Sequence, residues 1–329
     1  MESSQTLRLE DGRTIGYAEW GDPSGYPLLH FHGSSSSRLE HPVQTEALAG
    51  VRLVTVDRPG HGLSDFQPKR TLLEWPDDVA ALANHLGIER FAVSGLSFGG
   101  PYAMVCAYRS PERLTAVGLI SSFGPPDQPA ATAGMDRSNK MAFAMARRMP
   151  WAVNRQLMRM MGRTFTKDPE GTARRRFASL PASDQRALDD EQATDMLLAS
   201  MVESFRPGSD GSAWELRLLT RPWGFRLQDI GIPVALWHGD ADVNCPLATG
   251  RYLSHTIPDA SMTVLPGEGH FLILKHWGDI IRQLTVATDD SIRRNTPGGW
   301  EGGRCPPPLL EPTIQAWRAA TDERRTDDC

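Results

Sequence analysis

Cysteine is scarce in this sequence, and its few copies are scattered. The four residues are Cys106, Cys245, Cys305 and Cys329, with no C-x-x-C pair among them. A disulfide-rich secreted domain or a cysteine-based zinc site needs closer and more regular spacing. We therefore expect reduced thiols in a cytoplasmic protein, with Cys245 as an ordinary core residue.

Long apolar runs and an excess of basic residues are also missing. No stretch is long enough to span a bilayer, and residues 1–5 lack the basic and then apolar pattern of a signal peptide. The formal net charge of −5 gives no electrostatic reason to bind nucleic acid or an anionic membrane. These absences predict a small-molecule partner, with no nucleic acid and no membrane, and leave the oligomeric state open.

What the sequence does contain is an alternation of apolar strands and amphipathic helices. Two alternating segments around Asp11-Gly12 predict a β-hairpin. Further strands are predicted over 26–31, 51–56, 114–120, 233–238 and 261–265, with another beginning at Phe91, and helices over 71–86, 102–107, 247–255 and 272–286. Strands that alternate with helices through short turns predict an α/β fold with a mostly parallel sheet covered on both faces.

Strand patterns are missing from about residue 123 to about residue 224. This segment is rich in Met, Arg and Ala at helical spacings, with Met141, Met145 and Met149 four residues apart and a further stripe at Leu157, Met160 and Met161. Such stripes are more typical of core packing than of a binding surface, and the basic run 174–176 is typical of a solvated helix face. We therefore predict a core over 1–122 and 225–287, a helical cap inserted at 123–224, and a loosely ordered C-terminal tail at 288–329.

One short motif organises the predicted core. Gly95-Leu96-Ser97-Phe98-Gly99 fits the G-x-S-x-G pattern of a nucleophile elbow, with an apolar strand before it and a helix after it. Glycines on both sides let the strand and the helix pass closely, and the helix N-terminus favours negative charge that develops near Ser97 Oγ. We expect Ser97 to be a nucleophile.

Ser97 needs a base, because a neutral hydroxyl is a poor nucleophile near neutral pH. His270 follows the last predicted strand in a Gly-rich loop, residues 266–271, and is the expected base. An acid must orient the imidazole, and two candidates follow the preceding strand. Asp242 is the expected acid, and Asp240 is the alternative.

Four separate motifs resemble the α/β-hydrolase superfamily over about residues 6–286. They are His32-Gly33, the segment Asp57 to Ser64, the elbow, and the loops that carry Asp242 and His270, in the chain order Ser, Asp, His. By this resemblance, the backbone amides of Ser34 and Phe98 form the oxyanion hole, and neither a metal nor an organic cofactor is needed.

Other polar residues near these motifs have structural interpretations. His30 and His32 share a strand face, but no third ligand accompanies them, so a brace for the oxyanion turn is expected rather than a metal site. Asp57, Arg58 and His61 are expected to form a rigid turn held by hydrogen bonds, with Arg58 able to reach the mouth of the site.

The expected function is a serine hydrolase that cleaves an ester or related acyl bond of a small, apolar or aromatic substrate through an acyl-enzyme. Alternatives on the same core are a carbon–carbon bond hydrolase, a lyase or a perhydrolase. A peptidase resembling proline iminopeptidases is another, with Glu203 or Glu215 holding the amino terminus. A ligand sensor without turnover is the non-enzymatic alternative.

Overall fold

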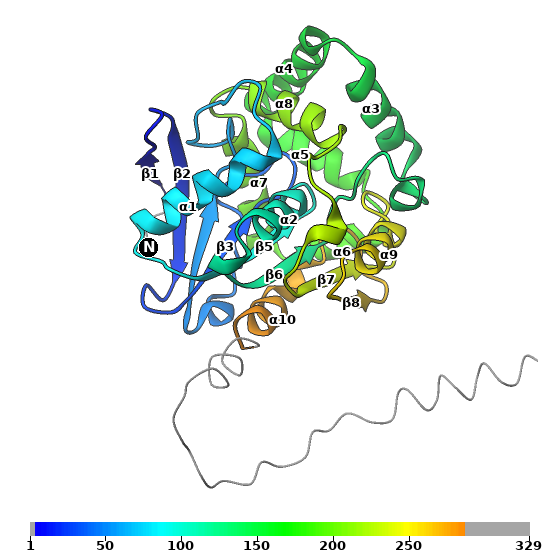
Figure 1. Cartoon of the computed structure of the whole chain (residues 1–329). Helices are drawn as coiled ribbons and strands as arrows, with labels where there is room; N and C mark the ends of the chain where they lie inside the picture. Colours follow the sequence, from blue (N-terminus) through cyan, green and yellow to red (C-terminus); the bar gives the residue numbers. More distant parts are fainter. Residues whose placement is uncertain (1–3, 287–329) are drawn as a thin grey trace, which may run out of the picture. The chain divides into compact units, whose positions relative to one another are not determined.

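The computed structural model describes residues 4–286, and its centre is an eight-stranded sheet (Figure 1). The sheet has the order β1-β2-β4-β3-β5-β6-β7-β8. Its strands are β1 (Gln5–Arg8), β2 (Thr14–Gly21), β3 (Tyr26–Phe31), β4 (Val51–Val56), β5 (Phe91–Leu96), β6 (Leu114–Ile120), β7 (Val234–Gly239) and β8 (Ala260–Leu265). β2 runs antiparallel to β1 and β4, and all other pairs are parallel. The carboxyl ends of β3 to β8 therefore meet at one edge, where sites form in such sheets.

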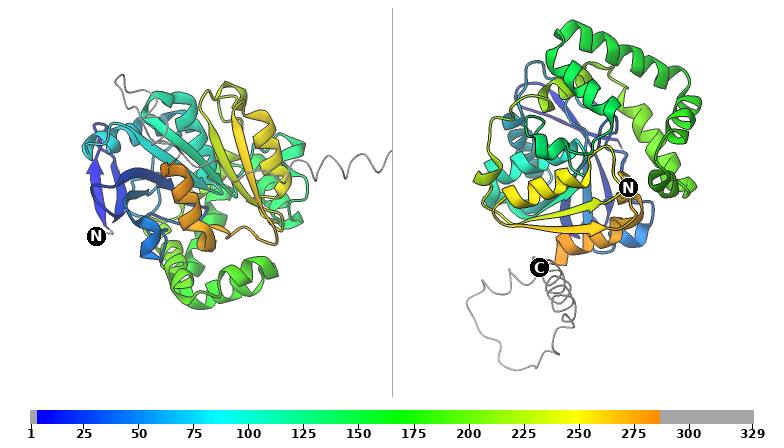
Figure 2. Two further views of the ribbon diagram at one scale, coloured as in Figure 1. Left: turned by 90° about the horizontal axis from the view of Figure 1, so that it is seen from below. Right: turned by 90° about the vertical axis from the view of Figure 1, so that its right-hand side faces the viewer.

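Helices cover both faces of the sheet. The helices α1 (Trp75–His85), α2 (Gly99–Arg109) and α9 (Leu247–Thr256) share one buried cluster with the sheet, and α10 (Ile273–Val286) belongs to the other (Figures 1 and 2). Strand β3 carries apolar residues on both of its faces, because both are covered: Leu29 and Phe31 face the first cluster, and Leu28 faces the second. The predicted α/β-hydrolase sheet is confirmed.

A run of helices separates β6 from β7. They are α3 (Arg137–Arg148), α4 (Trp151–Lys167), α5 (Pro169–Ala178), α6 (Ala182–Ala187), α7 (Glu191–Ser204) and α8 (Asp210–Leu219), which we call the helical insertion (green in Figure 1). The predicted boundaries at 122/123 and 224/225 fall in the connections before α3 and after α8. The predicted tail, 288–329, lies outside the described residues. Within residues 4–286, no helix has the length and apolar character to cross a membrane.

The apolar stripe predicted on α3 and α4 does not pack in a core. The side chains of Met141 and Met160 are 63% and 57% exposed, and Met145, Leu157 and Met161 are exposed as well. The helices turn other residues inward, including Ala146 on α3 and Gly162 and Phe165 on α4. Helical periodicity identifies an apolar face but not whether a neighbouring element covers it, so the core-packing interpretation of this stripe was wrong.

Candidate active site

The turn from β5 to α2 carries Ser97 in a strained conformation. Its φ is +51°, which is unusual for a residue with a side chain. A Cβ on Gly95 would lie 2.3 Å from the Gly99 carbonyl oxygen, and one on Gly99 would lie 2.0 Å from that of Phe31, so both positions require glycine. The turn is also tied to β6, because the Ser97 amide donates to Ile120 O (2.9 Å).

A second bond joins this turn to the start of the connection that leads to the helical insertion. The amide of Phe123 donates to the carbonyl oxygen of Ser97 at 2.9 Å. The backbone of the predicted nucleophile is therefore held by the last residue of β6 through its amide and by the segment that follows β6 through its carbonyl oxygen.

Ser97, His270 and Asp242 form one hydrogen-bonded chain. His270 Nε2 is 3.0 Å from Ser97 Oγ, and His270 Nδ1 is 2.8 Å from Asp242 Oδ2. The three side chains come from the ends of β5, β7 and β8, and all three residues are buried. With the Nδ1 proton donated to the carboxylate, Nε2 is left with a lone pair that can accept the hydroxyl proton.

The two aspartates that follow β7 have different partners. The second oxygen of Asp242, Oδ1, accepts hydrogen bonds from the amides of Asn244 (2.8 Å) and Cys245 (2.9 Å), so its carboxylate is fixed. Asp240 instead accepts the amide of Gly267 at 2.7 Å and braces the loop that carries His270. Asp242 is therefore the aspartate that contacts the imidazole.

The surroundings of His270 favour a charged imidazolium. Burial by itself lowers the pKa of the ring, but the charge of Asp242 and its hydrogen bond outweigh burial, and the pKa of His270 is raised above 6.5. Cys245 nearby behaves differently, since burial and the charge of Asp242 raise the pKa of its thiol. The thiol stays neutral, which agrees with its interpretation as a core residue.

Ser34 and Phe98, the predicted oxyanion-hole residues, lie in the turns that follow β3 and β5. Phe98 is the residue before the first turn of α2, and Ser34 follows the end of β3 at a turn where Ser35 has a φ of +52°. Within residues 4–286, neither the Ser34 nor the Phe98 amide donates a hydrogen bond to another backbone group. Both amides are available to bind an anion.

Buried histidines and one buried glutamate brace the turn after β3. His30 contacts Ser94 Oγ (2.8 Å) and Glu40 (3.0 Å), and His32 Nδ1 donates to Gly33 O (2.9 Å). Burial works to raise the pKa of Glu40, but the hydrogen bond and charge of His30 outweigh it and lower this pKa. Glu40 lies in no recognisable motif, so sequence reasoning missed it.

The segment after β4 forms the predicted rigid turn, but Arg58 does not reach an open mouth. The side chain of Arg58 is fully buried, donates to the carbonyl oxygens of His32 and Gly33, and forms an ion pair with Glu215 of α8 (Nε–Oε1 2.6 Å). Asp57 is held by the amide and guanidinium of Arg38. The turn after β3 is thus linked through Arg58 to the helical insertion.

A serine of the helical insertion contacts the same turn. Ser200 on α7 lies 2.8 Å from Ser36 Oγ and accepts the amide of Ser37 at 2.9 Å. Sequence reasoning missed Ser200, because a serine in the middle of a helix carries no local pattern that points to a site.

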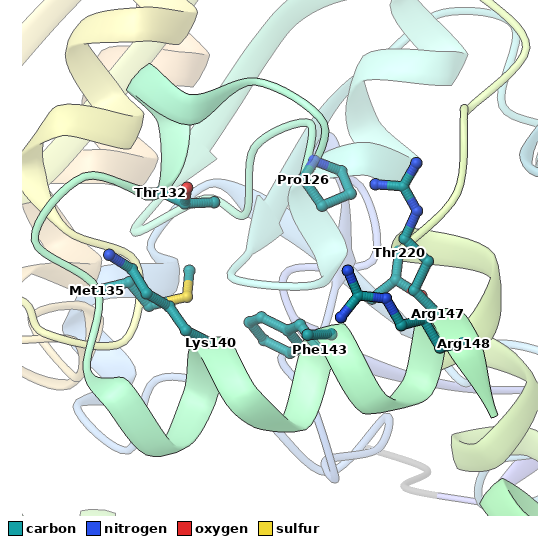
Figure 3. A pocket seen from close by; sticks show the side chains of 9 residues that line it. Pro126, Thr132, Met135, Lys140, Phe143, Arg147, Arg148 and Thr220 are labelled. Atoms are coloured by element: carbon teal, nitrogen blue, oxygen red, sulfur yellow. The ribbon is translucent and has the colours of Figure 1, made fainter.

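A cavity of about 490 Å³ opens between α3 and the loop before it (Figure 3). Phe143 lies in its wall and also packs against Phe98 and Phe123, with ring centroids 6.1 and 5.1 Å apart. Apolar lining comes from Phe143, Met135 and Pro126, and cationic lining comes from Lys140, Arg147 and Arg148; among residues 4–286, no carboxylate lines the cavity. The cavity therefore combines an apolar wall with positive charge, and its wall residue Phe143 packs against Phe98, which does not itself line the cavity.

Within residues 4–286, no group of His, Cys, Asp and Glu side chains is arranged to hold a metal ion. His30 and His32 use their ring nitrogens on the contacts that brace the turn after β3.

The chain matches a protein family that has the same fold as this structure. Residues 26–276 match the family model described as the alpha/beta hydrolase fold, which is more than half of the chain. The chain belongs to the α/β-hydrolase family. It is an enzyme of the hydrolase class, similar to carboxylesterases.

Two curated relatives cover most of the chain. A pimeloyl-[acyl-carrier protein] methyl ester esterase of Aromatoleum aromaticum is 32% identical over 247 residues, which is 74% of this chain and 89% of the relative. A 2-hydroxymuconate semialdehyde hydrolase of Pseudomonas putida is 25% identical over 265 residues, 77% of this chain and 83% of the relative. The first relative is named as an esterase and the second as a hydrolase.

Solved structures support the fold of this α/β-hydrolase. The enol-lactonase of Burkholderia xenovorans superimposes with a TM-score of 0.62 at 20% identity, over 87% of this chain and all of the other. A thermophilic esterase of Thermogutta terrifontis gives 0.60 at 21% identity, over 88% of this chain and 98% of the other.

Proposed function

We propose that this α/β-hydrolase is a serine esterase that works through an acyl-enzyme. His270 Nε2 takes the proton of Ser97 Oγ as this oxygen attacks the carbonyl carbon of the ester, and Asp242 orients the imidazole and stabilises the imidazolium. His270 then gives the proton to the leaving alkoxide. Water attacks the acyl-enzyme by the same route and releases the acid. The observation that carries the proposal is the Ser97–His270–Asp242 chain, with contacts of 3.0 and 2.8 Å.

The negative charge of the tetrahedral intermediate needs donors that are already in place. In the proposal the amides of Ser34 and Phe98 supply them, and the N-terminus of α2 adds a favourable dipole. Ser97 and His270 are buried, so these interactions act in a medium with little water, where they are stronger. Neither a metal nor an organic cofactor takes part.

The helical insertion acts in the proposal as a cap that shapes the substrate site. We place part of the substrate in the cavity beside Phe98, where Phe143 and Met135 give apolar contacts. The Aromatoleum aromaticum relative is named for a methyl ester, which supports an ester as the scissile bond. A small ester with an apolar or aromatic body fits these walls.

The peptidase alternative finds little support in the positions of its two candidate carboxylates. Glu215 is fully buried and forms its ion pair with Arg58, and Glu203 accepts a hydrogen bond from Arg38 at 2.8 Å. Neither acid is left to hold the amino terminus of a peptide. An aminoacyl-naphthylamide assay tests this alternative, and we expect no turnover that depends on Ser97.

The deciding experiment compares wild type with Ser97→Ala on a panel of esters, lactones, amides and β-diketones. We expect ester hydrolysis to fall by roughly 10³-fold or more in the variant, since the nucleophile is removed. Ser254→Ala is the matched control, because Ser254 lies on α9 and its hydroxyl donates to the backbone of its own helix, at Arg251 O. Hydrolysis that survives in Ser97→Ala would refute the mechanism. Tight binding without turnover by wild type would instead favour the ligand sensor.

A chemical probe gives a second readout. An organophosphonate that reacts with activated serines should modify the wild-type chain once, and mass spectrometry should place the adduct on the peptide that contains Ser97. Ser97→Ala should stay unmodified.

A further inference from the structure

The loop that carries His270 is held by a short helix of the helical insertion. Asp184 of α6 accepts the amide of Phe271 through Oδ1 at 3.0 Å, and Arg186 of the same helix donates to Gly267 O at 3.1 Å. These bonds reach residues on both sides of His270. The position of the His270 imidazole in the site therefore depends on α6, a helix that belongs neither to the sheet nor to the helices that cover it.

The contact between Asp184 and this loop is close and buried. Asp184 is fully buried, and a Cβ on Gly269 would lie only 2.2 Å from Asp184 Oδ1 and 2.8 Å from Ser183 Oγ. Gly269 thus leaves space for the carboxylate directly beside His270. Within the described residues, Asp184 Oδ2 has no hydrogen-bond partner, and burial raises the pKa of this carboxyl group. Keeping such a group in a core costs stability, which a purely structural contact could avoid with an apolar residue.

We infer that Asp184 is a positioning residue for catalysis, which holds the His270 loop so that the imidazole stays within hydrogen-bond distance of Ser97. This inference rests on the proposed esterase function. The backbone amide of Phe271 is the group that Asp184 holds, and His270 directly precedes it. A displacement of the loop by about 1 Å would weaken proton transfer, because displacements of this size can cost roughly 100-fold in rate.

The same reasoning explains why the helical insertion contributes polar side chains at three points of the site. Asp184 contacts the loop of the base, whereas Ser200 and, through Arg58, Glu215 contact the turn that carries Ser34. Asp184 is the contact nearest to a group that moves a proton.

The test compares Asp184→Ala with Asp184→Asn in the full chain. Alanine removes the acceptor of the Phe271 amide, and we expect kcat on an activated ester to fall by roughly 10- to 100-fold with KM little changed. Asparagine keeps an oxygen in place, and we expect kcat to return to within about threefold of wild type. The control is Asp189→Ala, an exposed aspartate just after α6, which should leave kcat unchanged.

A thermal unfolding measurement on each variant separates positioning from folding. If both Asp184 variants are stable at the assay temperature and Asp184→Ala keeps the wild-type kcat, the inference is wrong and the contact is only structural. An equal loss of kcat in Asp184→Asn and Asp184→Ala would also overturn the inference. It would show that an oxygen that accepts the Phe271 amide does not preserve kcat. The Ser97→Ala comparison tests the esterase itself, so the two failures can be told apart.

Gly269→Ala approaches the same contact from the other side. The added methyl group collides with the Asp184 carboxylate, so we expect a loss of kcat similar to that of Asp184→Ala. Gly231→Ala is the matched control, because a Cβ there meets nothing within 4 Å. A Gly269→Ala variant that folds and keeps full kcat would contradict the inference.

Discussion

The pKa of His270 determines how the activity depends on pH. Its imidazole accepts the Ser97 proton only when neutral, and its pKa is raised above 6.5, mainly by Asp242 acting against burial. Activity should therefore fall as pH drops through a value above 6.5 and be complete on the alkaline side. A profile of kcat/KM from pH 5 to 9 measures this limb, and a limb centred well below 6.5 would contradict the assignment.

Replacing Asp242 separates its two effects on His270. Asp242→Asn removes the charge that raises the pKa of His270, so the acid limb should move to lower pH. It also disturbs the tautomer, so kcat should fall by roughly 10³-fold or more. Asp189→Asn is the control, since Asp189 is an exposed aspartate just after α6. An acid limb that stays in place in Asp242→Asn would show that another group titrates.

Single residues also show where sequence reasoning succeeds. The elbow and the base lie in short segments whose local pattern reflects local geometry, so the sequence predicts Ser97 and His270 as partners, and the structure brings the two side chains within 3.0 Å. The choice between Asp240 and Asp242 depended on the path of one loop, and the structure brings Asp242 to the imidazole. Asp184 belongs to no motif. Its contact joins residues 87 positions apart, so no local pattern could indicate it.

Helix α8 contributes a buried ion pair that the sequence could not indicate. The Arg58–Glu215 pair is fully buried, and burial and the charge of Arg58 act in opposite directions on the carboxyl group, leaving the pKa of Glu215 at about 2. Glu215→Ala leaves a buried guanidinium without its partner, so we expect the free energy of unfolding to fall by about 3–5 kcal/mol. Urea denaturation measures this loss.

The matched comparison is an ion pair at the surface of the same helix. Asp210 pairs with Arg155 at 2.6 Å, and both side chains are partly exposed. Asp210→Ala should cost about 1 kcal/mol or less. Equal losses for the two variants would mean that burial does not decide the strength of these pairs.

Helix α3 places positive charge along the cavity beside Phe98. Because Lys140, Arg147 and Arg148 line it and no carboxylate of the described part of the chain does, an ester that carries a terminal carboxylate should have a lower KM than a neutral ester of equal length. Arg147→Ala or Arg148→Ala should raise the KM of the charged ester severalfold and leave that of the neutral ester unchanged. Arg174→Ala, an exposed arginine on α5, is the control. Equal effects on both esters would place the charged group elsewhere.

The same helices mark the limit of the periodicity argument. The stripe Met141, Met145, Leu157, Met160 and Met161 has helical spacing, but these side chains are exposed because no described element covers them. The strands of the sheet are easier to predict. Helices cover both of their faces, so an apolar run can be buried whichever face its residues point to.

The buried histidines of the whole molecule predict acid sensitivity. Burial lowers the pKa values of His32, His61 and His238, that of His61 from 6.5 to about 4. The folded state then binds fewer protons than the unfolded state, so stability is lost as pH falls from about 6.5 towards 4. His61 alone accounts for at most about 3 kcal/mol. His270 and Asp57, whose pKa values are raised, act in the opposite direction.

Thermal unfolding between pH 7.5 and 5 measures the balance of these groups. We expect the melting temperature to fall with pH and to fall less steeply in His61→Asn. A melting temperature that does not change over this range would show that the buried histidines do not control stability.

The backbone bond from Phe123 to the carbonyl oxygen of Ser97 has a consequence for building hybrid enzymes. The first residues after β6 support the nucleophile, although they directly precede the helical insertion in the chain. A donor segment from another family member should therefore be joined beyond residue 123. A junction placed at the end of β6 would transfer the donor's helices, as intended. It would also replace the residue that supports the backbone of Ser97.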